Sequence, residues 1–487
     1  MNEYVLTIDA GTTSIRCILF DKMDNIVSMS QRPITQYYPE PGWVEQDPME
    51  LIDLVRRTIS ECMSVADPKD CVSIGITNQR ETTVVWNRRT GLPVYNAIVW
   101  QDKRTMSSCC EIRETYGELI NEKTGLMVDP YFSSTKIAWI LDNVKGARQK
   151  ARSGDLLFGN IDTWILWNLT ERRVHATDHT NASRTMLFNI EKRDWDDELL
   201  SLFDIPPSML PKVHPSRYPF GIVDVCGHKI PINAIMGDQQ SALFGQSCFS
   251  EGEMKITLGT GGFMLMNTGR TLKRSEHGLL TTVAWTIDDD TQYAIEGSFY
   301  AAGSIMEWLR DKFGMVIDVR DTEKIADSVD DTAGCYFVPA FSGLGAPYWE
   351  QSSRGMIVGL TLGVGKEHII RATLESIAFQ INDIIDAMVA DTNVKPDMIR
   401  LDGGVSCNNF LCQFIADITN TKAICADCHE ATALGVAHLS GKGTLWDTFT
   451  ENDCGRTFTP AMSDEERKER ISEWRRAIKT AIHWSKI

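Results

Sequence analysis

The chain has 487 residues, 13 cysteines and a formal net charge of −17 at pH 7. This length is too great for one ordinary hydrophobic core and predicts two large domains with a cleft between them. The acidic balance excludes the broad basic surface of a general nucleic-acid-binding protein. No run reaches the roughly 18 apolar residues that span a bilayer and the first residues lack an export signal, so we expect a cytoplasmic protein without membrane insertion.

The first predicted element is a β-hairpin. Apolar runs at residues 4–8 and 15–20 predict two strands, and the polar segment 9–16, DAGTTSIR, joins them. Gly11 lets the backbone approach an anion, and Asp9 can hold a hydrated Mg²⁺. The hydroxyl and amide groups of Thr12, Thr13 and Ser14 can donate to phosphate oxygens. Arg16 adds a fixed positive charge. An ordinary hairpin with a small-residue turn is the alternative interpretation.

The next predicted elements lead to a polar strand end. Residues 26–31 predict a third strand, and residues 49–63 repeat apolar side chains at helical spacing. Two short β-rich runs, 72–77 and 82–86, flank the polar segment 78–81, NQRE. Ligands bind at such strand ends in α/β folds, so this segment is a candidate binding site.

The second half repeats this pattern. A strand-like run at 255–258 enters the turn 259–262, GTGG, and apolar residues resume at 263–266. We therefore place a domain boundary near 245–255 and predict an N-terminal domain at 1–248 and a C-terminal domain at 249–487.

Two long helices and a further strand follow the second turn. Residues 367–389 carry apolar side chains at helical spacing, and residues 398–401 predict a strand that enters 402–409, DGGVSCNN. A helix is expected to begin there, where phosphate is readily bound. A last helix begins near Ser463, which with Glu466 makes a capping-box pattern.

The cysteines are scattered, which fits reduced thiols in a cytosolic protein. Residues 425–429 spell CADCH, the attachment pattern of c-type haem. Covalent haem attachment is expected outside the cytoplasm, and no second ligand pair at zinc spacing accompanies these residues. We predict no transition metal.

Three small-residue turns, at 9–16, 259–262 and 402–408, lie in two α/β halves. This arrangement resembles the two-lobed nucleotide-binding fold of sugar kinases, hexokinase, actin and the Hsp70 ATPase, which is α/β and built from duplicated RNase H-like domains around an interdomain cleft. Residues 131–143, YFSSTKIAWILDN, and 355–375 are similar to the two signatures of the FGGY carbohydrate kinases. The resemblance runs to about residue 440.

Four shorter segments resemble the members of this family that phosphorylate glycerol: NQRETT at 78–83, AIVWQD at 97–102, DPYFS at 129–133 and GDQQSALFGQ at 237–246. The resemblance implies ATP-dependent conversion of glycerol to sn-glycerol 3-phosphate by in-line phosphoryl transfer, with Asp238 as the catalytic base. A triol has few apolar atoms, so polar groups must provide the specificity. The implied glycerol-binding residues are Arg80, Glu81, Trp100, Tyr131, Asp238, Gln239 and Phe263.

Taken without the resemblance, these residues have plainer interpretations. Arg80 and Glu81 fit a surface ion pair, Trp100 fits a core aromatic residue, and Asp238 fits the cap of a helix that begins at Gln239.

The resemblance also implies a nucleotide site and partners. The implied nucleotide-binding residues are Thr12, Thr13, Ser14, Arg16, Thr260, Gly303, Glu307, Gly404 and Asn408. The resemblance also places Asp9 and Asp238 beside the Mg²⁺ ion. Their carboxylates are expected to contact it through bound water molecules, because Mg²⁺ loses its hydration shell reluctantly. Glu307 stands where the family commonly has Gln, which places a negative charge near the nucleotide. The expected partners are glycerol and ATP or ADP, no nucleic acid, and further copies of the chain in a dimer or tetramer.

Two other functions stay open at this point. The first is another polyol or sugar kinase of the same family, with a larger pocket. The second is an ATP-driven switch in the manner of Hsp70 or actin, which needs no small-molecule acceptor. The pair Arg80–Glu81 and Asp238 argue against the switch, since it needs neither an acceptor site nor a base.

Overall fold

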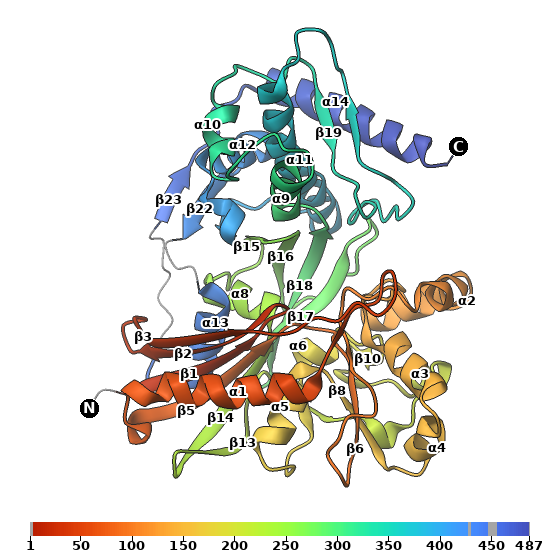
Figure 1. Ribbon diagram of the computed structural model, residues 1–487, viewed down its shortest axis with the longest axis vertical. Helices are drawn as coiled ribbons and strands as arrows, with labels where there is room; N and C mark the ends of the chain where they lie inside the picture. Colours follow the sequence, from red (N-terminus) through yellow and green to blue (C-terminus); the bar gives the residue numbers. More distant parts are fainter. Residues whose placement is uncertain (1–2, 427–429, 447–454, 487) are drawn as a thin grey trace.

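The computed structural model describes residues 3–426, 430–446 and 455–486. One mixed sheet runs through the molecule (Figure 1). Its N-terminal strands are β1 (Tyr4–Ala10), β2 (Ser14–Asp21), β3 (Ile26–Pro33), β5 (Cys71–Asn78), β13 (Arg217–Val225) and β14 (His228–Gly237). Its C-terminal strands are β15 (Met254–Leu258), β16 (Gly262–Gly269), β17 (Leu280–Ile287), β18 (Asp290–Phe299), β21 (Met398–Asp402), β22 (Lys422–Ala426) and β23 (Gly455–Phe458).

The two halves of this sheet repeat one topology. The N-terminal order β3-β2-β1-β5-β14 matches the C-terminal order β18-β16-β15-β21-β22. In each unit the first three strands are antiparallel and the next two are parallel additions. β13 and β17 join the units through the pair Arg217 and Ile287. The expectation of a duplicated α/β fold is therefore confirmed.

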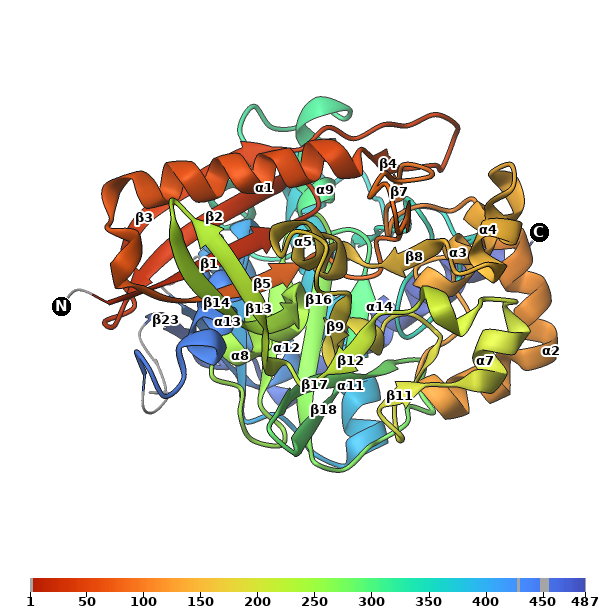
Figure 2. The same ribbon diagram turned by 90° about the horizontal axis from the view of Figure 1, so that it is seen from below.

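Helices cover both faces of the N-terminal sheet. Alternate residues of a strand point to opposite faces, so neighbouring apolar residues of β1 pack against different helices. Leu6 and Ile8 pack with Leu51 of α1 (Pro48–Cys62), which lies along β2 and β3 (Figure 2). Val5 instead packs with Ala433 of α13 (Ala431–Gly441). This helix comes late in the chain yet contacts β1, β5 and β14 (Figure 1).

In the C-terminal half, the predicted long helix is α11 (Lys366–Thr392), and its apolar stripe is buried as expected. It packs against α12 (Asn409–Thr419) and against β16 and β18. The capping pattern at Ser463 is also present, since its side chain accepts from the Glu466 amide at the start of α14 (Asp464–Trp484). The polar turns therefore rest on a packed scaffold.

A third core lies beside the N-terminal sheet. It is formed by α2 (Met106–Thr124), α3 (Ser133–Asn143), α4 (Ala147–Arg152), β6 (Val84–Asn87) and β8 (Leu156–Gly159). The other helices are α5 (Ile161–Leu169), α6 (His179–Ala182), α7 (Asp197–Leu202), α8 (Asp238–Gly245), α9 (Gly303–Asp311) and α10 (Asp321–Ala326). The short strands are β4 (Glu45–Gln46), β7 (Ala97–Ile98), β9 (Ala176–Asp178), β10 (Phe188–Asn189), β11 (Asp194–Trp195), β12 (Lys212–His214), β19 (Tyr336–Val338) and β20 (Met356–Val358).

One predicted strand begins later than expected. The strand expected at 82–86 begins at Val84, because Glu81 has a positive φ of 59° and the Thr82 amide donates to the Arg80 carbonyl, which makes a turn. Residues 427–429 of the CADCH pattern lie outside the described residues. The boundary at 248/249 stays a prediction.

Candidate active site

Arg80 and Glu81 lie directly beyond the end of β5, as the strand pattern predicts. The Gln79 amide donates to the Ala10 carbonyl at 2.8 Å, which ties this end to the hairpin formed by β1 and β2. Glu81 then takes its left-handed backbone conformation, which is unfavourable for a residue with a side chain. Such strain is retained where the surrounding structure holds a side chain in a required direction.

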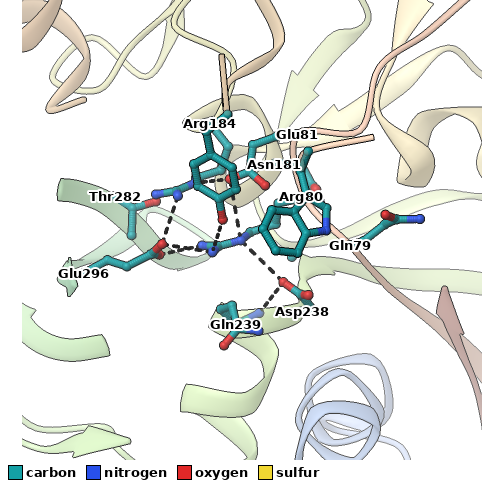
Figure 3. A network of polar contacts seen from close by, with 12 residues as sticks. Gln79, Arg80, Glu81, Asn181, Arg184, Asp238, Gln239, Thr282 and Glu296 are labelled. Atoms are coloured by element: carbon teal, nitrogen blue, oxygen red, sulfur yellow. Dashed lines mark hydrogen bonds and ion pairs between the residues drawn. The ribbon is translucent and has the colours of Figure 1, made fainter. Parts of the chain in front are cut away.

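The Arg80 guanidinium is buried between carboxylates (Figure 3). Its Nη1 and Nη2 atoms donate to the two oxygens of Glu296 at 2.6 and 3.0 Å. Its Nε atom lies 3.4 Å from Asp238 Oδ1 and 3.8 Å from Glu81 Oε1. A surface ion pair therefore does not describe Arg80 and Glu81, since both side chains are 1% exposed.

Three aromatic side chains lie beside these charged groups. The Trp100 ring lies 5.5 Å from Tyr131 and 5.9 Å from Phe263, centroid to centroid, and both contacts are edge-on. Trp100 Nε1 donates to the Thr12 hydroxyl at 2.9 Å. The Tyr131 hydroxyl lies 3.4 Å from Arg80 Nη2. The predicted acceptor residues and the turn at residues 9–16 are thus brought together from both halves of the chain.

Asp238 is the first residue of α8, and its side chain is 26% exposed, so a ligand can reach it. Its Oδ1 accepts from the Gln239 amide at 2.7 Å. Burial raises the pKa of Asp238 to about 6, although Arg80 beside it acts in the opposite direction. A carboxyl with this pKa is largely ionised at neutral pH and is still a stronger base than an ordinary aspartate.

Gln239 is oriented by a buried lysine that the sequence did not suggest. Lys255 Nζ donates to Gln239 Oε1 and, at 2.8 Å, to the Thr257 hydroxyl. Because the carbonyl oxygen of the Gln239 amide is used by Lys255, its NH₂ group is left to donate elsewhere. Burial lowers the pKa of Lys255 to about 8.

The remaining small-residue turns converge in the C-terminal half. A Cβ on Gly303 would lie 2.7 Å from the Gly259 carbonyl and 3.3 Å from Val405, so the start of α9 touches both turns. Gly403 has φ of 89°, and a Cβ there would overlap the Leu258 carbonyl. Glycine is required where three backbone segments meet this closely.

The predicted nucleotide residues of this half differ in their surroundings. Thr260, Glu307 and Gly404 are exposed. Asn408 caps α12, its Oδ1 accepting from the Leu411 amide at 2.9 Å. The Asn408 side chain therefore has a structural role whatever it does for a ligand.

The first turn carries an ion pair. Arg16 Nη2 donates to Asp9 Oδ2 at 2.6 Å, and its Nη1 donates to Glu430 at 2.9 Å. Burial raises the pKa of Asp9, and Arg16 acts against it. Thr13 and Ser14 lie at the same turn, where the Gly11 amide donates to the Ser14 carbonyl at 3.0 Å.

Sequence reasoning missed Glu296 and Arg184, which join the Arg80 network. Arg184 Nε donates to Glu81 at 2.6 Å, and its Nη2 donates to Glu296 at 2.9 Å (Figure 3). A weak signal existed, because Glu296 is the one charged residue between Tyr293 and Phe299. A charge inside an apolar strand needs a partner.

The duplicated halves, with small-residue turns and a buried polar network between them, define the two-domain fold of the sugar kinases and their relatives. The chain matches the N-terminal domain of the FGGY family of carbohydrate kinases over residues 4–245 and the C-terminal domain over residues 254–443. It belongs to this family of kinases.

Relatives of known name align over the whole chain. A glycerol kinase of Clostridium botulinum (strain 657 / Type Ba4) is 51% identical over 494 residues, covering 99% of this chain and 99% of that protein. Glycerol kinase 2 of Thermotoga maritima is 50% identical over 496 residues, covering 99% and 100%.

Solved structures agree with this fold. The structure of Plasmodium falciparum glycerol kinase with ADP superposes with a TM-score of 0.93 at 38% identity, covering 99% of this chain and 98% of that chain. A gluconate kinase from Lactobacillus acidophilus superposes at 0.89 with 21% identity, covering 100% and 99%, which shows the fold alone.

Proposed function

We propose that this kinase transfers the γ-phosphoryl group of ATP to a terminal hydroxyl of glycerol, giving sn-glycerol 3-phosphate and ADP. The observation that carries the proposal is the position of Arg80, whose Nε and Nη2 atoms face Asp238, Glu81 and Tyr131. The relatives named glycerol kinase, at about 51% identity over the full length, support the same substrate.

Glycerol is held by paired donors and acceptors. Arg80 donates to hydroxyl oxygens, and Glu81 accepts hydroxyl protons. Gln239 adds a donor because Lys255 fixes its amide orientation. Trp100 and Phe263 border the carbon chain and limit its length, which disfavours larger polyols and ketopentoses. An analogue lacking one hydroxyl leaves a buried polar group unpaired and binds weakly.

Asp238 acts as the base. It accepts the proton of the attacking hydroxyl as the bond to phosphorus forms and the bond to the ADP oxygen breaks. Phosphoryl transfer depends mainly on in-line positioning and charge neutralisation, so Asp238 also aligns the nucleophile.

ATP is held between the turns. Amides and hydroxyls of Thr12, Thr13 and Ser14 donate to phosphate oxygens from one side, and Thr260 does so from the other. Arg16 adds positive charge, while Gly303, Glu307, Gly404 and Asn408 lie toward the nucleoside and its phosphates.

Magnesium enters as part of the nucleotide substrate. Within the described residues, no three acidic, histidine or cysteine side chains form a set that could hold a metal ion. We propose that the phosphates of ATP carry the ion and that Asp9 and Asp238 approach it, because Mg²⁺ keeps several waters and is usually bound through one or two carboxylates and substrate phosphates.

The cellular location and the oligomeric state of the enzyme remain predictions. No helix within residues 3–426, 430–446 and 455–486 is long and apolar enough to cross a membrane. We propose a cytoplasmic location and a homo-oligomer, a dimer or tetramer. Its molar mass in solution, set against 54.7 kDa for the chain, tests the latter.

The direct test is ADP production from Mg-ATP with and without glycerol, for the wild type and Asp238→Asn. We expect glycerol-dependent turnover in the wild type and a loss of about 10²- to 10⁴-fold in kcat in the variant, with ATP affinity nearly unchanged. Asp47→Asn is a matched control, because Asp47 also stands at a helix start and Asn caps equally well. Turnover with another polyol and none with glycerol would point to a different substrate in the same family.

A further inference from the structure

Four buried charges form a closed arrangement at the acceptor site. Arg80 and Arg184 alternate with Glu81 and Glu296, and each of the four side chains is at most 1% exposed. Arg184 binds Glu81 and Glu296 at 2.6 and 2.9 Å, and Arg80 binds Glu296 through both Nη atoms. The charges of the four cancel one another.

The pairing with Glu296 determines which edge of Arg80 is left for a ligand. A guanidinium has five N–H groups in one plane. Glu296 takes the outer end, Nη1 and Nη2, and Gln240 accepts from Nη1 at 3.2 Å. The side edge, Nε and Nη2, is therefore turned toward Asp238, Glu81 and Tyr131.

We propose that Glu296 and Arg184 are positioning residues: Glu296 holds Arg80 with its side edge toward the acceptor hydroxyls, and Arg184 holds the Glu81 carboxylate beside it. The inference rests on the proposed function, because it concerns the residues that bind glycerol there. Glu296 comes from β18 in the C-terminal half, whereas Arg80, Glu81 and Arg184 come from the N-terminal half. The acceptor site is thus complete only when the two halves are docked.

Stability alone does not account for this arrangement. Burying charges has a high desolvation cost, and replacing such a group by apolar residues of similar volume is often neutral or stabilising. Two arginines with two glutamates in fixed directions, by contrast, preorganise a polar ligand site. The four charges are therefore assigned to orientation.

Replacing Glu296 by Gln gives a prediction that a purely structural role does not share. Asp238 lies beside Arg80 and accepts from the Gln239 backbone amide, and the charges of Glu81 and Lys255 also act on it. Without the Glu296 charge, Arg80 turns toward Asp238, already 3.4 Å away. Arg80 then competes with glycerol for this carboxylate, and it stabilises the ionised form and lowers the pKa of Asp238.

The experiment compares kcat, the KM for glycerol, the KM for ATP and the pH profile in wild type, Glu296→Gln and Glu375→Gln. Glu375 is a matched control, since it is also buried and paired with two arginines, Arg371 and Arg470, but lies on α11 outside the site. For Glu296→Gln we expect a loss of about 10²-fold in kcat/KM for glycerol and an unchanged KM for ATP. In the pH profile we expect the acidic limb, the fall of activity at low pH, to move to lower pH. A variant that is only destabilised loses activity at higher pH than the wild type.

Two further variants test the same inference if Glu296→Gln does not fold. Glu296→Asp keeps the charge but is one methylene shorter, so the KM for glycerol rises while the acidic limb stays in place. Arg184→Lys keeps the charge but loses the two-point contact, so the KM for glycerol rises and the KM for ATP does not. Unchanged glycerol kinetics in these folded variants would overturn the inference. Absence of glycerol turnover in the wild type would instead refute the proposed function.

Discussion

We expect the ionisation of the proposed base, Asp238, to set the pH dependence of the reaction. Burial raises its pKa to about 6, and the base acts only when it is deprotonated. We therefore expect kcat/KM for glycerol to be level near neutral pH and to fall by about tenfold per pH unit well below pH 6. Initial rates between pH 4.5 and 8, with thermal stability checked at each pH, measure this limb. A level profile down to pH 5 in folded enzyme would contradict the assignment.

Gly237 gives Arg80 the space it occupies. A Cβ at Gly237 would lie 2.8 Å from both Cγ and Cδ of Arg80 and 2.9 Å from Gln240 Oε1. Gly237→Ala therefore displaces the guanidinium, and we expect the KM for glycerol to rise about tenfold or more with little change in the KM for ATP. Gly363→Ala is the control, because its nearest neighbour would be 3.7 Å away. Equal glycerol kinetics in both variants would show that Arg80 tolerates the added methyl group.

At the residue scale, sequence reasoning reached the groups that sit in recognisable local segments. Arg80 and Glu81 follow a strand, as the local pattern indicates. A helix start was also expected at Asp238, but Asp238 is the first residue of α8 and Gly237, not Asp238, is its N-cap. Glu296, Arg184 and Lys255 were missed because their importance lies only in contacts between distant segments. Arg80 and Glu296 are separated by 216 positions along the chain. No local periodicity encodes such a pair.

Helix α2 offers two glycines whose substitution has opposite effects. Gly117 is inside the helix, and a Cβ there would meet only Arg113 Cγ at 3.6 Å, an ordinary contact. Gly125 ends the helix with φ of 72°, and a Cβ there would lie 2.7 Å from Thr281 Cβ. We expect Gly117→Ala to stabilise the protein by about 0.5–1 kcal/mol and Gly125→Ala to destabilise it by at least as much.

Thermal or urea unfolding of the two single variants measures both effects. Glycerol kinetics should change in neither, since α2 contributes none of the proposed acceptor residues. A Gly117→Ala variant less stable than the wild type would show that this turn of α2 is not regular helix.

Most elements around the site were predictable because period-2 and helical patterns are strong there. The hairpin of β1 and β2, the strand β21 and the helix α11 lie within a few residues of their predicted bounds. The start of β6 was less well predicted. The positive φ of Glu81 delays that strand, and an acidic side chain is not the usual sign of a left-handed position.

At the scale of the whole molecule, the halves are more interlocked than two consecutive domains imply. α8 contacts β15 and β16 of the C-terminal half, whereas α13 packs on β1, β5 and β14 of the N-terminal half. One core cluster contains Met236, Leu265 and Val436 together. The duplication itself was predicted from the repeated turns, but this exchange of helices depends on shape complementarity that the sequence pattern does not carry.

The relatives that align over the full length are named as kinases. The alternative of an ATP-driven switch without a small-molecule acceptor therefore finds no support.

The crossing of α8 and α13 joins these halves beside the proposed active site. A Cβ on Gly435 would overlap the Ser241 carbonyl, and a Cβ on Gly245 would overlap the Ala431 carbonyl. The two helices therefore touch backbone to backbone, and any larger residue at Gly435 pushes α8 away. Because Asp238 is the first residue of α8, the displacement also moves the proposed base.

We expect Gly435→Ala to destabilise the protein by about 1–3 kcal/mol, as overpacking does, and to lower kcat with glycerol as well. Ala437→Gly is the matched control on the same helix. Ala437 packs against the N-terminal sheet with Val5, so its loss costs about 0.5–1 kcal/mol of helix stability without changing the spacing of α8 and α13. Thermal unfolding and kcat, measured below the unfolding range of both variants, separate the two effects. A kcat that falls equally in both would mean that general loss of stability, and not the position of Asp238, limits turnover.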